Sequence, residues 1–324
     1  MKANPLIVGI DVPWFDQLIR LKNMPRDNES MQIAESSCQG GGKVATALVA
    51  AARQGIPCKM IAVLGDGSRG HFLLEDFVRH GIDVTDISVK KGYQEGFSIV
   101  ISDTESGGRR ILWSYDDQGN GLTTEDIENC SDTISQAKFL HLCRMDAVDR
   151  KAAEIARMAG TQVCLDADFY SPEIVESLYL VDILIGSEEF YHQYFPLGGD
   201  MKENLRFMMA SGPSTVIFTF GKQGCRGMAG DTYFEMPAFQ KNIKVVDTVG
   251  AGDVFHGGYL AGLCKGLDPT ESARLASAVS AIKCTGIGGR AAIPDYKTVT
   301  EYLNTGSFPD DEIRQRIKYY NRNI

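Results

Sequence analysis

The chain has 324 residues, 44% hydrophobic and 23% charged, and a net charge of −9. A chain of this length can bury a large core, and the composition is that of an ordinary globular protein. The acidic balance argues against nucleic acid or an anionic membrane as a partner. We expect a cytoplasmic protein with reduced thiols, since there is no secretory segment, no apolar run near 18 residues long, and eight cysteines that are scattered singly.

Strand-like apolar runs alternate with helical patterns along the chain, which predicts βαβ units and a mostly parallel sheet. The first helix is expected at Lys43–Arg53, and a buried strand follows at Lys59–Leu64. Further strands are expected at Phe139–Leu142, Val163–Leu165, Ile183–Ile185, Val216–Phe220 and in a β-rich run at Lys241–Val246, and further helices at Val148–Met158, Lys202–Ala210, Val254–Leu263, 269–283, 296–304 and Asp310–Tyr320.

One region breaks this alternation. Two β runs, Phe97–Ser102 and Arg110–Tyr115, flank a glycine-containing turn, which predicts a hairpin. A similar β-capable stretch spans about 17–39. These strands are expected to form a small sheet beside the α/β core, or else a surface hairpin without a role.

The most informative segment is Asp247-Thr248-Val249-Gly250-Ala251-Gly252-Asp253, which precedes an apolar helix pattern. Small residues at a helix start leave backbone N–H groups bare, and those donors and the helix dipole attract anions. Asp253 lies beside them, where a carboxylate can take a proton from a hydroxyl that attacks a phosphoryl group. The segment therefore indicates a kinase site; the alternative is a glycine-rich turn that only packs a helix against a sheet.

This block resembles the D-T-x-G-A-G-D signature of the ribokinase-like (PfkB) family of small-molecule kinases. The resemblance implies that Asp253 is the catalytic base and that Gly250, Ala251 and Gly252 help to form the anion hole for the transferred phosphoryl group.

The resemblance extends from residue 6 to about residue 304. It implies an α/β fold with a three-layer αβα core, a mostly parallel sheet and a small β-sheet lid. We expect a single domain over 1–324, with the lid formed by insertions at about 13–39 and 92–118.

A glycine run, Gly40 to Gly42, precedes the first helix and lets the backbone come close to a ligand. The segment is similar to the family signature G-G-x-x-x-N-x-A, which implies that Gly41, Gly42, Lys43 and Thr46 contact the sugar. Thr46 stands where the family usually has asparagine, and a hydroxyl cannot replace both the donor and the acceptor of an amide. The hydrogen bonds to the sugar are therefore expected to differ from those of ribose or fructose kinases.

The family also places an aspartate after the first strand, where it accepts hydrogen bonds from sugar hydroxyls. We favour Asp16 for this role, with Asp11 as its rival. Arg110 and Arg144 are the candidate contacts for an anionic group on the substrate. For Arg144 the alternative is a solvated strand end or a salt bridge to Asp146.

Within the family the chain most resembles the sulfofructose kinase branch. The shared features are the triple glycine, Asp253-Val254-Phe255-His256-Gly257, Lys283-Cys284-Thr285 and the run Gly288-Gly289-Arg290-Ala291-Ala292-Ile293-Pro294. Arg144 matches the sulfonate-binding arginine of that branch, but its lysine and asparagine partners fall on Ser30 and Ser114. We therefore expect the chain to lie near this branch of the family, but we do not expect it to share the branch's sulfonated substrate.

For the nucleotide, the segment from Thr219 to Gly224 resembles the family's T-x-G-x-x-G motif. It implies that Thr219, Gly221 and Gly224, together with Gly288 further along, bind ATP. Ser187 and Phe190 stand where the family has the asparagine and the glutamate of N-x-x-E, a motif that organises Mg²⁺. Glu188 is the acid that can substitute for it.

Many relatives hold a monovalent cation beside the anion hole. Asp247 and the carbonyl of Val249 match that site, which leaves room for K⁺ as a further cofactor. Lys283, in the matching segment, is expected either to touch phosphate or to lie on a helix surface.

Together these features predict an ATP- and Mg²⁺-dependent kinase that phosphorylates a hydroxymethyl group of a sugar or sugar-derived small molecule. The alternatives are a nucleoside kinase of the same family and a catalytically idle sugar-binding protein. The expected partners are the sugar and ATP, without nucleic acid or membrane, and the family's lid edges make a homodimer a further possibility.

Overall fold

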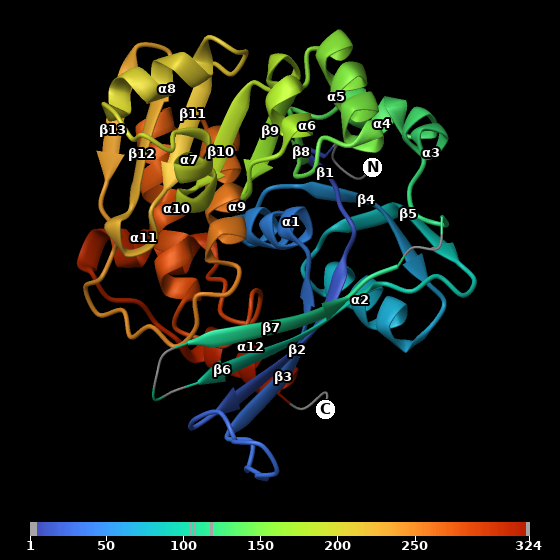
Figure 1. Ribbon diagram of the computed structural model, residues 1–324, viewed down its shortest axis with the longest axis vertical. Coiled ribbons are helices and arrows are strands. Elements are labelled where there is room, and N and C mark those ends of the chain that lie inside the picture. Colours follow the sequence, from blue (N-terminus) through green and yellow to red (C-terminus); the bar gives the residue numbers. More distant parts are fainter. Residues whose placement is uncertain (1–4, 104, 106–107, 117–118, 322–324) are drawn as a thin grey trace.

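The computed structural model describes residues 5–103, 105, 108–116 and 119–321 (Figure 1). Within them nine strands form one large sheet, in the order β13-β12-β11-β10-β9-β8-β1-β4-β5. These strands are β1 (Ile7–Ile10), β4 (Cys58–Gly65), β5 (Asp83–Lys90), β8 (Phe139–Leu142), β9 (Gln162–Ala167), β10 (Ile183–Ser187), β11 (Thr215–Thr219), β12 (Cys225–Ala229) and β13 (Thr232–Met236). Neighbouring strands are parallel except for the antiparallel pairs β11–β12 and β12–β13.

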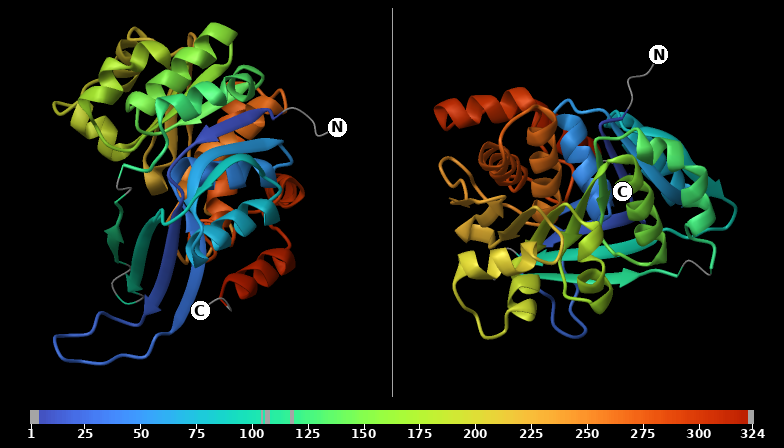
Figure 2. Two further views of the ribbon diagram at one scale, coloured as in Figure 1. Left: turned by 90° about the vertical axis from the view of Figure 1, so that its right-hand side faces the viewer. Right: turned by 90° about the horizontal axis from the view of Figure 1, so that it is seen from above.

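Helices cover both faces of this sheet, because strand side chains alternate between the faces and both sets are apolar (Figure 2). In β1, for example, Ile7 belongs to one buried cluster and Val8 to the other. The first cluster includes residues of α1 (Lys43–Arg53), α2 (Ser68–Arg79), α9 (Ala251–Cys264), α10 (Pro269–Lys283), α11 (Tyr296–Thr305) and α12 (Asp311–Tyr320). The second includes residues of α3 (Thr124–Asn129), α4 (Ser131–Ser135), α5 (Ala147–Ala159), α6 (Pro172–Glu176), α7 (Glu188–Tyr194) and α8 (Met201–Met209). The expected three-layer α/β fold is confirmed.

A second, four-stranded sheet stands beside the large one (Figures 1 and 2). Its order is β3-β2-β6-β7, with β2 at Trp14–Leu21, β3 at Glu35–Gly41, β6 at Gly96–Asp103 and β7 at Arg109–Ser114. The predicted hairpin is confirmed as the antiparallel pair β6–β7. Leu18 and Val100 of this small sheet pack against Ile287, which fixes one face of the sheet toward the core.

The other predicted helices and strands lie within three residues of their observed bounds, with one exception. The expected strand at Lys241–Val246 is wrong, because this segment is a loop in the structure. The hydroxyl of Tyr302 donates to the carbonyl of Lys241, and the Asn242 amide donates to the carbonyl of Gly306. These hydrogen bonds hold the segment against the end of α11. Its β-branched residues favour a strand, but the tertiary contacts override that local preference.

Helix α9 approaches its neighbours unusually closely, and glycines make this possible. A Cβ at Gly257 would collide with the backbone carbonyl oxygen of Ala47 in α1, and one at Gly258 would lie 2.9 Å from the Cα of Ala276 in α10. The centre of α9 is buried on all sides. This packing holds the first turn of α9 at the carboxyl-end edge of the large sheet. Among the described residues no helix is both long and apolar enough to cross a membrane.

We expect Gly257→Ala to lower the free energy of unfolding by about 1–3 kcal/mol, because the added methyl meets backbone that cannot move aside. At an open helical site the same change would stabilise the helix by roughly 0.5–1 kcal/mol, so the sign of the effect is diagnostic. Urea denaturation measures it. Glu301→Ala, at an exposed position of α11, is the control and should stay within about 0.5 kcal/mol of wild type. A stabilised Gly257→Ala variant would contradict this account of the packing.

Candidate active site

The predicted phosphoryl-binding segment lies at the start of α9. Gly250 is the residue before the helix and has a φ of 74°, a conformation that favours glycine. A Cβ there would also lie 2.9 Å from the Cα of Gly289. Gly252 and Asp253 are the second and third helical residues, so the helix has no acceptors for their N–H groups. The positive end of α9 therefore presents donors suited to an anion.

Three carboxylates gather around this helix start. Asp166 is the next-to-last residue of β9, Asp168 comes directly after that strand, and Asp253 is half-buried in α9. Burial and then the charges of Asp166 and Asp168 raise the pKa of Asp253 well above its ordinary value. Burial and the Asp168 charge likewise raise the pKa of Asp166 to about 7, although Lys43 opposes the shift. These carboxyls therefore bind protons unusually strongly.

Lys43 is the cation of this cluster. Its ammonium lies 2.7 Å from a carboxylate oxygen of Asp168. Burial by itself would lower the pKa of Lys43, but Asp166 and Asp168 raise it above its ordinary value. Lys43 is the first residue of α1, so its charge and the dipole of that helix act on the same carboxylates. The predicted substrate-binding position Lys43 is thus brought close to the predicted base.

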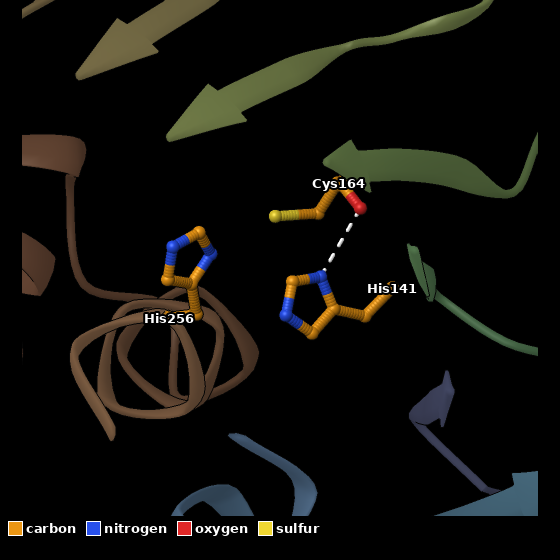
Figure 3. Close-up of side chains that lie close together, drawn as sticks. All are labelled: His141, Cys164 and His256. Atoms are coloured by element: carbon orange, nitrogen blue, oxygen red, sulfur yellow. Dashed lines mark hydrogen bonds between the residues drawn. The ribbon is translucent and has the colours of Figure 1, made fainter. Parts of the chain in front are cut away.

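Behind the acids lies a fully buried pair of histidines (Figure 3). His141 comes from β8 and His256 from α9; their rings stack with centroids 5.2 Å apart, and the thiol of Cys164 lies beside them. Burial lowers the pKa of His141 to about 4 and that of His256 to about 3. His256 approaches a carboxylate oxygen of Asp166 to 3.8 Å. Because both rings are neutral, they do not offset the negative charge of the acids.

Asp16 lies inside β2, on the face of the small sheet that packs toward the core. Its carboxylate accepts a hydrogen bond of 2.6 Å from the hydroxyl of Ser98, and a Cβ at Gly41 would collide with it. Burial raises the pKa of Asp16. The strand registers align Gln39, Asp16, Ser98 and Trp113 across the four strands, so these side chains share one face. Trp113, 69% exposed, contacts Trp14 edge to face.

The same registers separate the two neighbouring arginines of β7. Arg110 pairs with Ile101, one position out of step with the row of Asp16, and so points to the opposite face of the small sheet. Arg109 shares the face of Asp16. The structure therefore does not bring Arg110 to the other predicted substrate contacts, and the one-residue alternation of a strand is the reason.

Asp11, the rival of Asp16, is the aspartate that follows β1 directly. Its carboxylate accepts from the N–H groups of Ala45 (3.0 Å) and Val12 (2.8 Å), and it is buried. A Cβ at Gly42 would lie 2.8 Å from the same carboxylate, and the φ of Gly42 is 93°. Asp11 thus binds the first turn of α1, which leaves Asp16 as the acid on the core-facing side of the small sheet.

Arg290 is fully buried beside two of the predicted substrate contacts, Gly41 and Thr46. Its guanidinium donates to the carboxylate of Asp76 (2.7 Å), the carbonyl of Gly41 (2.7 Å) and the hydroxyl of Thr46 (3.5 Å). The predicted substrate contact Thr46 is therefore engaged by an arginine, at the position where the family usually has asparagine.

Arg144 is held by acids of its own neighbourhood. Its guanidinium lies 3.1 Å from Asp146, 3.5 Å from Asp149 and 3.6 Å from Asp11. The salt bridge to Asp146, which the sequence left open as the alternative, is present. Three carboxylates surround the guanidinium, and their negative charge offsets its attraction for an anionic group on the substrate.

A cavity of about 520 Å³ opens on the other side of α9. It brings together the predicted nucleotide-binding residues Thr219, Gly221 and Gly224 with Ala251 and Gly252 of the predicted anion-binding turn. The rest of its lining is largely apolar or small: Cys225, Ala238, Phe239, Ile243, Val245, Phe255, Ser277, Ser280, Ala281 and Cys284 are among these residues. An apolar cavity that ends at a helix N-terminus is suited to a flat base attached to phosphates.

The other predicted cofactor contacts, Ser187, Glu188 and Gly288, do not line this cavity. The Ser187 hydroxyl caps α7 by accepting from the N–H of Phe190, and it donates to the carbonyl of Asp168. Glu188 is about half exposed and lies 3.8 Å from His192. The N–H of Gly288 donates to Asp247 (2.8 Å), so Gly288 supports the loop before α9 and does not line the cavity.

Lys283 differs from both of its expected roles. It is fully buried, and its ammonium donates to the carbonyls of Asp247 (3.1 Å) and Val249. These are the two residues that were predicted to hold a monovalent cation. Asp247 itself accepts through its carboxylate from the N–H groups of Val249 and Gly288.

Sequence reasoning missed Asp166, Asp168 and Arg290 as parts of the site. The first two lie at the carboxyl end of an apolar strand, where ligands collect in α/β sheets, so their position was a usable signal. Arg290 was part of a recognised motif, but no local pattern reveals that its partners are Asp76 and Gly41.

Comparisons with known proteins agree with this geometry. The model of the pfkB family carbohydrate kinases matches residues 10–295. The chain is 25% identical over 301 residues to a nucleoside kinase from Methanothermobacter thermautotrophicus, covering 91% of this chain and 94% of that protein. It is 26% identical over 298 residues to a ribokinase from Staphylococcus aureus, covering 88% and 95%.

Solved structures show the same fold. A putative ribokinase from Agrobacterium tumefaciens has a TM-score of 0.78 at 25% identity, over 93% of this chain and 97% of that one. The ribokinase of Arabidopsis thaliana, complexed with ribose and ATP, has a TM-score of 0.78 at 20% identity, over 92% and 98%. The fold and the match to the family model thus define a ribokinase-like α/β kinase. The chain belongs to the pfkB family of carbohydrate kinases and is an ATP-dependent enzyme of that family. The resemblance to the sulfofructose kinase branch stays a prediction.

The raised pKa of Asp166 makes a prediction about stability. A carboxyl whose pKa is higher in the folded state stabilises the fold at low pH, and this stabilisation is lost as the pH rises through about 7. From about pH 5 to about pH 8, wild type should lose on the order of 1–4 kcal/mol of unfolding free energy relative to Asp166→Asn. Urea denaturation without nucleotide or metal measures this. Asp231→Asn, an exposed aspartate in a turn, should run parallel to wild type, and a pH profile of Asp166→Asn that also parallels wild type would contradict the assignment.

Proposed function

We propose that the protein transfers the γ-phosphoryl group of ATP to a hydroxymethyl group of a sugar or sugar-derived small molecule, with Asp253 as the general base. The observation that supports this most directly is the position of Asp253 beside the donors at the start of α9. Its raised pKa means that the ionised form of this carboxylate is a stronger proton acceptor than an ordinary aspartate. The N–H groups of the Gly250–Gly252 turn are placed to stabilise the charge on the transferred group.

The sugar is proposed to lie between the small sheet and the start of α1. Asp16 accepts hydrogen bonds from the sugar hydroxyls. On the side of α1, the backbone at Gly41 and Gly42 and the ammonium of Lys43 border the sugar. The small sheet acts as a lid, and its closure excludes water that would otherwise compete for the phosphoryl group.

The nucleotide is proposed to occupy the cavity behind α9, with its phosphates at the helix start. Mg²⁺ neutralises charge on the phosphates when it is bound. Glu188 and Asp168 are the acids that would hold it or its waters: Asp168 is one-third exposed, Glu188 is about half exposed, and Ser187 joins the two segments. Both offer the oxygen ligands that this ion prefers.

Asp253→Asn tests the base. We expect the rate of ADP release with the active sugar to fall at least about 10²-fold, because the amide cannot take the proton. The Kd for ATP, measured by calorimetry, should rise little, since the variant keeps the helix start and removes a negative charge. Asp231→Asn should behave like wild type. Equal rates for Asp253→Asn and wild type would refute the assignment.

Asp16→Asn and Asp11→Asn separate the two rival aspartates. Asp16→Asn should raise KM for the sugar by about 10-fold or more, the effect of about 1.4 kcal/mol, with little change in Tm. Asp11→Asn should lower Tm, because Asp11 binds the first turn of α1. Initial rates and thermal melting of both variants measure this, and the reverse pattern would make Asp11 the sugar contact.

One observation supports a second function, a nucleoside kinase. Trp113 lies in the row of Asp16 and is exposed on the same face, with Trp14 against its edge. An exposed indole can stack on a nucleobase as well as on the apolar face of a sugar. A substrate panel of ketoses, aldoses, sugar acids, sugar phosphates and nucleosides decides between them: stimulation by nucleosides alone would favour this second function, and sugar binding without turnover would favour an idle binding protein.

A further inference from the structure

The loop that precedes α9 surrounds a buried positive charge. Lys283 is the last residue of α10, and it has no exposed surface. A buried ammonium is unstable unless it is hydrogen-bonded and near negative charge. Lys283 meets both conditions, because the carbonyls of Asp247 and Val249 accept from it and the carboxylates of Asp247 and Asp253 are near it. Burial lowers the pKa of Lys283, and these two negative charges oppose that shift.

Backbone hydrogen bonds close the surrounding loops around this ammonium. The N–H groups of Val246 and Asp247 both donate to the carbonyl of Cys284, at 2.7 and 3.2 Å. The carboxylate of Asp247 accepts from Val249 and Gly288 at 3.0 and 2.8 Å. The loop before α9 is thus joined to the loop after α10. The carbonyl oxygens of Asp247 and Val249 both point at the Lys283 nitrogen. Carbonyl oxygens converging in this way are also what a dehydrated monovalent cation requires.

A monovalent cation does not fit beside Lys283. The family resemblance implies such an ion at Asp247 and Val249, but the oxygens that would bind it already accept from the ammonium. A second positive charge at the same carbonyls would be repelled by the first across a few ångströms of protein interior. The site of the cation is therefore taken by a side chain of the chain itself.

The position of this charge bears on the anion-binding turn. The peptide that joins Val249 to Gly250 is planar, so its C=O and N–H point in opposite directions. Holding the Val249 carbonyl toward Lys283 turns the N–H of Gly250 away from it. That N–H belongs to the turn that is proposed to bind the phosphoryl group. In addition, the Ser280 hydroxyl of α10 donates to the carbonyl of Ala251 (2.8 Å), so α10 holds the turn at two places.

We propose that the ammonium of Lys283 replaces the monovalent cation of related kinases, and that Lys283 is a positioning residue that orients the phosphoryl-binding amides and makes the activity independent of K⁺. The effect on activity rests on the proposed phosphoryl transfer. The replacement of the cation can be tested without it.

Three variants test the proposal. Lys283→Ala removes the charge and opens space for an ion, whereas Lys283→Met removes the charge and keeps most of the side chain's volume. Lys297→Ala is the control, because Lys297 is exposed on α11. Thermal melting and ADP release are both measured in KCl and in tetramethylammonium chloride, at the same ionic strength of about 0.1 M so that screening is equal.

Wild type and Lys297→Ala should show the same Tm and the same turnover in both salts. Lys283→Ala should have a lower Tm in tetramethylammonium, which is too large to enter, and K⁺ should raise that Tm in a saturable manner, as binding to the folded state requires. Its turnover should fall at least about tenfold and recover with K⁺, since misplaced anion-hole donors cost catalysis. Lys283→Met should lose turnover without recovery in K⁺.

Activation or thermal stabilisation of wild type by K⁺ would overturn the proposal, and this result needs no variant to fold. A Lys283→Ala variant that is fully active in tetramethylammonium, or whose Tm ignores K⁺, would overturn it as well. If no sugar or nucleoside stimulates turnover, the proposed function fails, but the Tm of Lys283→Ala in the two salts still decides whether a cation takes the place of the ammonium.

Discussion

The close packing of α9 against α1 and α10 is the constraint on which the site depends. Gly257 and Gly258 remove the side chains that would separate these helices, so backbone meets backbone in the centre of the layer. Because α9 is fixed there, its first turn lies at the edge of the large sheet where β9 ends. A displacement of the helix by the width of a methyl group would move Asp253 and its neighbouring amides together.

This edge collects more negative charge than its surroundings neutralise. Asp166, Asp168 and Asp253 lie near one ammonium, that of Lys43, and the histidines behind them are uncharged. Burial and mutual repulsion therefore raise the pKa of Asp166 and Asp253. Such an arrangement is unfavourable for the fold, and shifted carboxyls of this kind cluster at functional sites. On the opposite side of the α9 turn, Lys283 supplies a positive charge from within the chain.

The small sheet determines which polar groups face this edge. Strand register puts Asp16, Ser98 and Trp113 on one face and Arg110 on the other. Arg290, buried beneath the start of α1, holds the carbonyl of Gly41 and the hydroxyl of Thr46. The polar groups on this face therefore differ from what the motifs alone imply, because strand register and buried hydrogen bonds select among the motif residues.

The sequence by itself determined the layered α/β architecture, most element bounds, and the presence of a glycine-containing helix start at Gly250–Asp253. These depend on periodicity and on residues adjacent in the chain, as with the glycine whose φ of 74° begins α9. Only the tertiary structure decided the partners of Lys283, Asp16 and Arg290, which lie 34, 82 and 214 residues away at Val249, Ser98 and Asp76. It also decided that Lys241–Val246 is a loop and that Arg110 faces away from Asp16. The physical reason is that a side chain's charge and its local pattern say which interactions it needs, whereas packing and strand register decide which distant group supplies them.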